Sequence, residues 1–227
     1  MTVELIDYMG SDLTVVNAAR VSFDKQSDWE EIPFGGHASA HRLPNSLSKK
    51  DKDLIIYLAK HNHWTPFGHC SAQFRVTAPV FVARQLVKHQ VGLVWNETSR
   101  RYVNNSPEFW KPTVWRASAD NKKQGSSSTG VSSQDIIEHV YDDTVRHARD
   151  SYNYLLNFGV CPEQARSLLP QSMITQWYWS GTLAAFSRVY KLRSKEDAQQ
   201  ETRIIAEEIN NHMIKLFPKS WEALCGN

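Results

Sequence analysis

The clearest alternation of apolar and polar positions in the chain runs from Cys70 to Ala78. Every second residue from Cys70 onward is apolar, and the residues between them are polar or charged. Because successive side chains of a strand point to opposite faces, this pattern predicts a half-buried β-strand. Pro79 suits the first turn of a helix, and the helix-favouring run "VFVARQLVKHQ" follows it. We therefore expect a helix in which Arg84, Gln85, Lys88 and His89 share neighbouring turns.

Two long segments have the periodicity of amphipathic helices. In the first, apolar residues recur every three or four positions up to Gly159, a natural helix stop. These residues are Ile137, Val140, Tyr141, Val145, Ala148, Tyr152, Leu155 and Leu156. In the second, Ser194 and Asp197 resemble a capping box that opens a helix over "DAQQETRIIAEEINNHMIKLF", which ends before Pro218. A shorter helix is predicted over "DLIIYLAKH".

Two polar stretches interrupt these elements, near residues 35–50 and 117–134. The second, "SADNKKQGSSSTGVSSQ", has almost nothing to bury, so we expect a mobile surface loop inserted into the fold. Neither stretch resembles a domain boundary, and residues 1–227 are expected to form one domain. Helices mixed with a few alternating strands, without regular strand and helix alternation, favour an α+β fold.

Composition excludes several classes of protein. The 26 basic and 24 acidic residues leave a net charge of +2, too balanced for a general binder of polyanions or anionic membranes. No stretch has the length of a membrane span or the pattern of an export signal, so a soluble, cytoplasmic protein is expected. The three cysteines, Cys70, Cys161 and Cys225, are scattered and suggest neither a disulfide framework nor a thiolate metal site.

Most candidate ligand-binding residues follow Pro79 in the sequence. Guanidinium and ammonium groups of Arg84, Lys88, Arg100 and Arg101 suit phosphate, and Gln85, Asn96 and Glu97 could pair with the edge of a planar polar ring. A phosphorylated heterocycle would use both sets. The alternative is an ordinary solvated helix face. The arginines at 166, 188 and 193 favour the ligand interpretation, because they lie beside apolar residues, where arginines usually have anionic partners.

The segment "HNHWTPFGH" raises the possibility of a metal site, because it contains His61, His63 and His69. The spacing fits no zinc pattern, so we expect no metal and leave open a structural role or contact with a ligand. No nucleophile elbow, P-loop or G-x-G-x-x-G motif occurs. If the protein is an enzyme, a cofactor is expected to perform the difficult step.

Six segments together resemble the flavin-dependent thymidylate synthases (ThyX). These are "NAARVSF", "HNHWTPFGH", "APVFVARQLVKHQ", "NETSRRY", "QARSLLP" and "KLRSKEDAQQE", in the family's order and approximate spacing. The resemblance implies a ThyX-like fold, with a central, mostly antiparallel sheet packed against long helices in a homotetramer. It implies FAD bound between subunits and reductive methylation of dUMP to dTMP with methylenetetrahydrofolate and NADPH. Neither a nucleic-acid nor a membrane partner is expected.

Matching segments carry the family's site residues over to this chain. The nucleotide dUMP would contact Gln85, Lys88, Glu97, Ser99, Arg100, Arg101, Arg166 and Arg193. FAD would contact Ser22, His63, Thr65, Lys88, His89, Gln90, Glu97 and Arg188. Arg193 would be the catalytic residue, because it matches the arginine thought to favour the ionised N3 of uracil, which raises electron density at C5. Ser99 would position the nucleotide, since nothing adjacent to it resembles its base.

The chain departs from the family at the flavin contacts. Lys88-His89-Gln90 stands for Arg-His-Arg, and eight residues, not seven, precede Ser99. The family's Asn-x-Arg falls on Thr182 and Ala184, and Arg188 could replace the lost cation. A divergent, even viral, member would fit these changes, with the host cytoplasm as its location. Two alternatives stay open: a related flavin-dependent dUMP-modifying enzyme such as a hydroxymethylase, and a non-catalytic nucleotide- or nucleic-acid-binding module whose tryptophans stack on bases.

Overall fold

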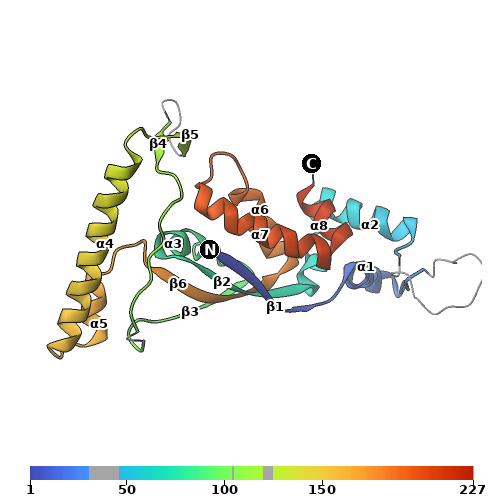
Figure 1. The fold of residues 1–227 in the computed structure, drawn as a ribbon. Coiled ribbons are helices and arrows are strands. Elements are labelled where there is room, and N and C mark those ends of the chain that lie inside the picture. The colour runs from blue at the N-terminus through green and yellow to red at the C-terminus, as the bar shows by residue number, and fades with distance from the viewer. Residues whose placement is uncertain (31–45, 104, 120–124, 227) are drawn as a thin grey trace, which may run out of the picture.

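The protein is built around a four-stranded antiparallel sheet in the order β1-β2-β6-β3 (Figure 1). The computed structural model describes residues 1–30, 46–103, 105–119 and 125–226. The strands are β1 (Thr2–Met9), β2 (Ser71–Pro79), β6 (Ile174–Thr182) and β3 (Leu93–Glu97). Helices α6 (Leu183–Arg193), α7 (Gln200–Leu216) and α8 (Pro218–Cys225) lie over one face of the sheet. The α+β prediction with a mostly antiparallel sheet is confirmed.

The predicted strand is β2, and its apolar face forms the centre of the core. Cys70, Ala72, Phe74, Val76 and Ala78 are all buried, whereas the alternate residues of β2 are partly exposed. The ring of Phe74 meets the edge of Phe186 from α6 at 5.1 Å, and Trp95 of β3 stacks on Trp177 of β6 at 4.3 Å. Burial of these large rings fixes α6 against the sheet, since each ring removes a large apolar area from water.

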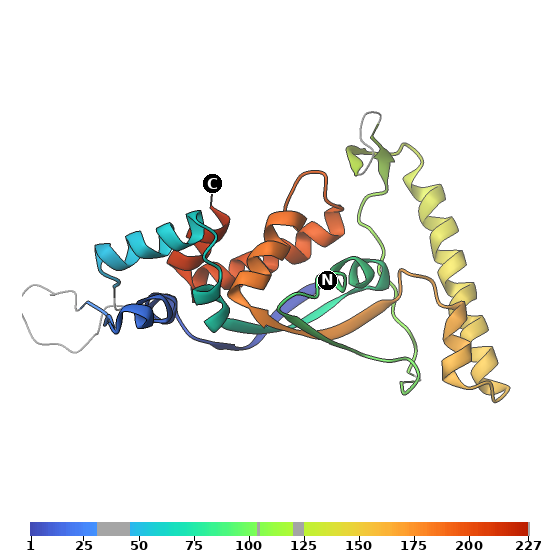
Figure 2. The same cartoon turned by 180° about the vertical axis from the view of Figure 1, so that it is seen from behind.

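The elements near the start of β2 gather at one end of the sheet (Figure 2). They are α1 (Asp12–Arg20), the 3-10 turn η1 (Val21–Phe23), α2 (Lys49–Lys60) and the 3-10 turn η2 (Thr65–His69). The helix predicted over "DLIIYLAKH" corresponds to α2, which starts earlier, where the Ser48 side chain caps the backbone N–H of Asp51. Most of the polar loop expected near 35–50 lies outside the described residues.

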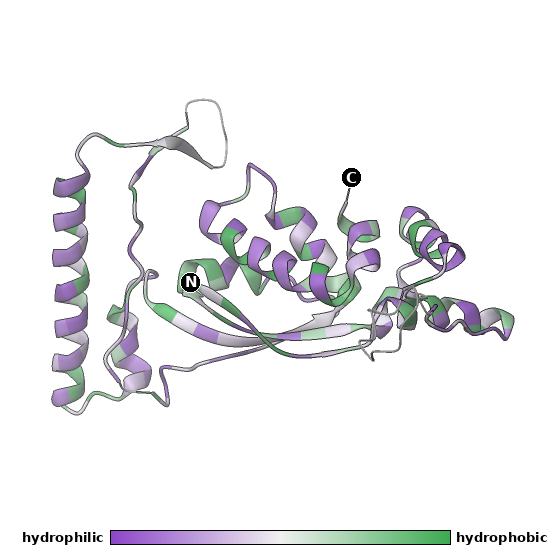
Figure 3. Ribbon diagram, turned by 45° about the vertical axis from the view of Figure 1, so that its right-hand side comes forward, coloured by the Kyte–Doolittle hydropathy of each residue, from purple (hydrophilic) through white to green (hydrophobic). Residues whose placement is uncertain are grey.

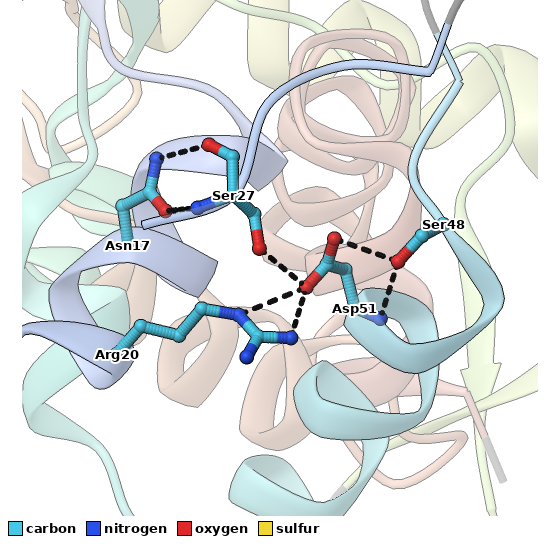
Figure 4. Close-up of polar contacts among 5 residues, drawn as sticks. All are labelled: Asn17, Arg20, Ser27, Ser48 and Asp51. Atoms are coloured by element: carbon cyan, nitrogen blue, oxygen red, sulfur yellow. Dashed lines mark hydrogen bonds and ion pairs between the residues drawn. The ribbon is translucent and has the colours of Figure 1, made fainter. Parts of the chain in front are cut away.

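A buried carboxylate joins α1 to α2 (Figure 4). The side chain of Asp51 accepts hydrogen bonds from Arg20 Nε at 3.0 Å, Ser27 Oγ at 2.9 Å and Ser48 Oγ at 2.7 Å. Burial alone would raise the pKa of Asp51, but the bonds from Arg20, Ser48 and Ser27 outweigh it and hold the pKa below its usual value. Since Arg20 directly precedes η1, this network fixes η1 beside α2.

The helix after β2, α3 (Val80–Leu86), is shorter than predicted. Lys88 and His89 lie in the turn that follows it, so the expectation that they share helical turns with Arg84 and Gln85 is wrong. The physical reason is the approach to β3. Gly92 has φ of +77°, which glycine adopts without steric cost, and the chain reverses there so that Leu93 can pair with Gly181.

The long helix α4 (Gln134–Asn157) stands apart from the helices that cover the sheet (Figures 1 and 3). It is followed by α5 (Pro162–Ala165) and the 3-10 turn η3 (Arg166–Leu168). The predicted helix and its stop at Gly159 are confirmed, but Tyr152 is the only buried member of the apolar stripe within this helix. Val140 is 60% exposed and Tyr154 is 62% exposed, so much of its apolar surface faces outward.

Two further expectations need correction. The sequence predicts a loop over 117–134, but this segment contributes to a hairpin of β4 (Arg116–Ser118) and β5 (Ser126–Gly130). Ser194 does not open the last long helix, because it ends α6, and α7 begins only at Gln200. The end of α7 before Pro218 is as predicted. In the described ranges, no helix has the length and apolar character needed to cross a membrane.

Candidate active site

A cavity of about 610 Å³ opens at the Pro79 end of the sheet, and we call it the Arg166 cavity. Its lining includes Glu97 at the end of β3, Arg100 in the turn that follows, Arg166 from η3 and Arg84 from α3. The family resemblance predicts that Glu97, Arg100 and Arg166 hold the nucleotide. Arg84 belongs to the same basic cluster of the sequence, but the resemblance assigns it no ligand.

Neighbouring groups hold the side chains of the Arg166 cavity in place. Thr175 Oγ1 donates to Glu97 Oε1 at 2.8 Å, which connects the carboxylate to β6. Arg100 Nη1 donates to Asn105 Oδ1 at 2.9 Å. Arg166 uses its Nε to bind the Glu163 carbonyl at 3.2 Å. The Nη groups of Arg166 form no hydrogen bond to any residue that the structure describes, so its forked end can bind an anion.

A second cavity, of about 540 Å³, is lined by Gln85 and Arg193, and we call it the Arg193 cavity. Arg116 from the base of the hairpin and Gln199 from the start of α7 also line it. Arg84 and Gln85 are consecutive residues of α3 and point about 100° apart, so this helix supplies one residue to each cavity.

His89 sets the position of the Arg193 guanidinium. Arg193 Nε donates to His89 Nε2 at 2.9 Å, so the imidazole accepts at Nε2 and its proton sits on Nδ1. Burial lowers the pKa of His89, and the charges of Arg193 and Arg188 lower it further. The ring is therefore neutral at pH 7, as an acceptor for a guanidinium must be.

Three of the residues expected to contact FAD lie away from both cavities. Ser22 on η1, and His63 and Thr65 around η2, are exposed at the end of the sheet where β2 begins. Phe23, 76% exposed, and Trp64, 61% exposed, lie within one residue of them in sequence. The nine-residue β2 separates this patch from the Arg166 cavity by about 26 Å, at about 3.3 Å per residue.

The other predicted contacts lie on exposed turns. Arg101 Nε donates to Ser99 Oγ at 3.3 Å, and its guanidinium lies 4.9 Å from the centre of the Tyr102 ring. Lys88 and Gln90 are exposed and line neither cavity. Arg188 Nη2 donates to the Val91 carbonyl at 2.7 Å, next to the turn that holds these two residues.

Two of the positions where the family's Asn-x-Arg falls have structural roles in this subunit. Thr182 caps α6, since its Oγ1 accepts from the Ala185 backbone N–H at 3.1 Å. Ala184 is 3% exposed and faces the core. Arg188 is exposed on the same helix, so among these three positions it is the one placed to contact a ligand.

A single subunit does not bring the predicted arginines into one cavity. Arg166 lines one cavity, Arg193 lines the other, and Arg101 lies on an exposed turn. What they share is the lack of an acidic partner. None of Arg84, Arg100, Arg101, Arg166, Arg188 and Arg193 forms an ion pair with a carboxylate in the described part of the chain.

The cysteines are poorly suited to act as nucleophiles. Burial raises the pKa of Cys70 to about 11 and the pKa of Cys225 to about 12, so neither forms a thiolate at neutral pH. Cys161 is exposed at the start of α5 and lines neither cavity.

The three histidines do not surround a common point for a metal. His61 and His63 pack their rings around Tyr57, at 4.3 and 5.9 Å between ring centres. Among residues 1–30, 46–103, 105–119 and 125–226, no group of three or more His, Cys, Asp or Glu side chains is arranged to hold a metal ion.

Three polar residues beside Gln85 were missed as functional candidates. Arg116, Gln199 and Glu201 form a connected set of hydrogen bonds that reaches the Gln85 amide. A signal for two of them was present, since "KLRSKEDAQQE" is among the segments that resemble the family and contains Gln199 and Glu201. Arg116 carried no such signal, because it precedes a stretch that reads as a polar loop.

Comparison with known proteins identifies the family of this chain. The family model described as "Thymidylate synthase complementing protein" matches residues 4–219. A flavin-dependent thymidylate synthase from Thermosipho africanus is 34% identical over 222 residues, covering 96% of this chain and 88% of the relative. One from Wolbachia pipientis wMel is 34% identical over 225 residues, covering 97% and 72%.

A solved structure has the same fold. The crystal structure of a UMP/dUMP methylase, PolB from Streptomyces cacaoi bound with 5-Br dUMP, superposes with a TM-score of 0.81. It is 28% identical and covers 98% of this chain and 93% of its own. The chain described here belongs to the flavin-dependent thymidylate synthase family.

Proposed function

We propose that this protein is a flavin-dependent thymidylate synthase, a methyltransferase that converts dUMP to dTMP. Its cofactor is FAD, and methylenetetrahydrofolate and NADPH are its co-substrates. The observation that carries the proposal is the set of arginines around the two cavities that lack carboxylate partners. Phosphate is the anion that such forked donors fit, and Gln85 and Glu97 supply the polar groups that a pyrimidine edge requires. The reaction takes place in the cytoplasm, or in the host cytoplasm if the source is a virus.

The proposed chemistry assigns the main catalytic role to Arg193. Uracil C5 is a weak nucleophile, and a guanidinium beside the ring stabilises the negative charge that develops when C5 attacks an electrophile. His89 keeps this guanidinium oriented through the bond from Arg193 Nε. No enzyme nucleophile is required, which suits a chain in which the thiol pKa values of Cys70 and Cys225 are raised.

The residues present fit a flavin. Exposed rings of Phe23, Tyr57 and Trp64 offer flat apolar surface, and Ser22, His63 and Thr65 add hydroxyl and imidazole groups. Arg188, Lys88 and Gln90 would hold the phosphates and polar atoms of FAD together with His89 and Glu97. Bound flavin would supply the reducing equivalents that turn the transferred carbon into a methyl group.

The site is proposed to form between subunits of a homotetramer. Two observations support this. The predicted contacts are spread over separate parts of one subunit, about 26 Å apart along β2, at about 3.3 Å per residue. In addition, Ile136 of α4 and Phe158, the residue that follows this helix, are 68% and 71% exposed in the described part of one subunit.

The activity is tested by purifying the protein and measuring flavin absorbance and tritium release from C5-labelled dUMP with methylenetetrahydrofolate and NADPH. We expect a yellow protein that releases tritium and forms dTMP. A colourless protein that neither binds added FAD nor releases tritium would refute the proposal. Mass analysis of the product distinguishes methylation from hydroxymethylation, whose product is heavier by one oxygen. UMP is a useful second substrate, since the structural neighbour is named for both nucleotides.

The tryptophans give little support to the nucleic-acid alternative. Trp64 is the one exposed tryptophan, and the other seven, all described, are buried or half-buried. A stacking platform for single strands needs several exposed rings in a row. Indifference to single-stranded oligonucleotides at low salt is therefore expected.

Sharing of the site can be tested by complementation. Arg101→Ala and Arg193→Ala each disable one part of the site. If the two arginines of one site come from different subunits, co-expression forms mixed oligomers in which some sites are intact, and activity returns. No recovery in mixed oligomers would place both residues in the same subunit.

A further inference from the structure

A line of hydrogen bonds connects the base of the β4–β5 hairpin to the Arg193 cavity. Arg116 Nη2 donates to Glu201 Oε1 at 2.7 Å, and Gln199 Nε2 donates to Glu201 Oε2 at 3.0 Å. Gln85 Nε2 in turn donates to Gln199 Oε1. The line ends where Thr202 Oγ1 donates to Gln85 Oε1 at 3.0 Å.

The buried carboxylate sets the direction of the whole line. Glu201 is 4% exposed, and an ionised carboxylate accepts hydrogen bonds but donates none. Gln199 must therefore turn its NH₂ group toward Glu201 and its oxygen toward Gln85. Gln85 must then turn its NH₂ group toward Gln199 and its oxygen toward Thr202. Neither amide can flip without placing two donors or two acceptors face to face.

Arg116 compensates the negative charge of the carboxylate at this position. Its guanidinium binds Glu201, and its Nε donates to Ser126 Oγ of β5 at 2.7 Å, which fixes the arginine on the hairpin. Without this partner, a carboxylate as buried as Glu201 would be an uncompensated charge. A neutral carboxyl group in its place could donate as well as accept, and the direction of the amides would no longer be defined.

The Gln85 amide retains one N–H and one oxygen lone pair for a ligand in the cavity. Uracil and cytosine differ at the matching edge, because uracil has a carbonyl oxygen at C4, which accepts a hydrogen bond, whereas cytosine has an amino group there, which donates one. An amide held in one direction pairs with one of the two patterns, provided that the phosphate contacts hold the base in one place.

We propose that Arg116 and Glu201 are positioning residues that fix the direction of the Gln85 amide, so that the site accepts a uracil nucleotide and rejects the cytosine equivalent. The inference rests on the proposed function, since it assigns uracil to the Arg193 cavity. Neither Arg116 nor Glu201 need touch the nucleotide. The polar β4–β5 segment thereby acquires a role in selecting the base.

The test compares the dissociation constants of dUMP and dCMP by calorimetry on the FAD-loaded protein and its Glu201→Gln variant. Wild type is expected to bind dUMP at least about 100-fold more tightly than dCMP. The amide that Glu201→Gln introduces keeps its oxygen on the Arg116 guanidinium and turns its NH₂ group toward Gln199, so the line of amides reverses. We expect weaker dUMP binding, tighter dCMP binding and a ratio that falls at least about tenfold.

Matched variants separate this role from a general loss of structure. Arg116→Lys keeps a cation on Glu201 and should leave the ratio within about threefold of wild type, whereas Arg116→Ala should lower it as Glu201→Gln does. Lys111→Ala is the control. It breaks the exposed ion pairs of Lys111 with Glu138 and Asp142 of α4 and should leave the ratio of the two dissociation constants unchanged. Flavin absorbance and melting temperature verify that each variant is folded.

The outcomes distinguish the inference from the proposed function. Suppose that wild type methylates dUMP, and that Glu201→Gln weakens the binding of dUMP and dCMP by the same factor or changes neither. The positioning role is then wrong and the proposed function stands. If wild type binds dUMP and dCMP equally, the positioning role is also wrong. If wild type binds no dUMP, both proposals fail.

Discussion

Two sets of arginines in this protein have opposite surroundings. Arg20 and Arg116 bind the carboxylates of Asp51 and Glu201, which are 2% and 4% exposed, and they join elements far apart in the chain. Arg166 and Arg193 line cavities and have no carboxylate partner in the described ranges. The same side chain therefore serves structure in one setting and is free to bind a ligand in the other.

The difference shows what identifies a ligand-binding arginine. Arg166 is exposed and Arg193 is half-buried, so each guanidinium remains accessible to an anion that replaces its water. The partner of Arg193 differs from those of Arg20 and Arg116. His89 is a neutral acceptor, so it orients the guanidinium of Arg193 without neutralising its charge. This arrangement keeps the full positive charge available to a nucleotide ring.

The largest effect is expected for Arg193→Ala. Loss of the guanidinium should lower kcat by about 100- to 1000-fold, because its charge acts mainly on the transition state. The dissociation constant for dUMP should rise by less than about tenfold. Steady-state kinetics and calorimetry measure the two quantities, and an equal change in both would remove its catalytic role.

Among the arginines that bind carboxylates, the pair of Arg20 with Asp51 is expected to contribute most to stability, and Asp51→Ala tests it. It leaves Arg20 without its partner and removes the acceptor for Ser27 and Ser48, so the free energy of unfolding should fall by about 3 kcal/mol. Urea denaturation measures this quantity. Glu4→Ala, which breaks the exposed pair with Arg75, is the control and should cost about 0.5 kcal/mol or less. Similar losses in both variants would contradict the special role given to the buried carboxylate.

Arg101→Ala tests whether an exposed arginine without a carboxylate partner binds the nucleotide. We expect dUMP affinity to fall by about 1.5 to 3 kcal/mol if the guanidinium makes a charged hydrogen bond to the nucleotide. The melting temperature should hardly change, because Arg101 is exposed and its side chain binds Ser99 and Tyr102 within its own turn. An unchanged dissociation constant would show that Arg101 is an ordinary solvated residue.

The smallest effect concerns the pH dependence of His89. The pKa of His89 is lowered in the folded protein. As the pH drops below about 6.5, the unfolded chain binds a proton at this histidine more readily than the folded protein does, so the free energy of unfolding decreases. The loss should stay under about 1 kcal/mol, since the ring is only half-buried and solvent screens it. Denaturation of wild type and His89→Gln at pH 7 and pH 5.5 measures the difference. Identical pH dependence would exclude this histidine as its source.

Local patterns in the sequence predict much of the fold. The alternation from Cys70 to Ala78 gives β2 and its buried face, and the periodicity before Gly159 gives α4. These predictions succeed because one element and one buried face determine them. The end of α3 was missed, because pairing of Leu93 with Gly181 in β6 decides where the chain turns, and these residues are far apart in sequence.

The candidate site is less predictable for the same reason. Basic residues near Arg100 and Arg166 indicated an anion site, and the structure brings Glu97, Arg100 and Arg166 to one cavity. The partners of Arg20 and Arg116 could not be read from the chain, since Asp51 and Glu201 are 31 and 85 positions away. Only the fold shows which arginines have a carboxylate and which do not.

The outward apolar surface of α4 has a consequence for handling the enzyme. If partner subunits cover residues such as Ile136, Val140 and Tyr154, the fraction of complete sites follows mass action. Specific activity would then decline when the protein is diluted below its assembly constant and recover on reconcentration. A catalytic assay performed at very low enzyme levels would underestimate the turnover of the assembled enzyme.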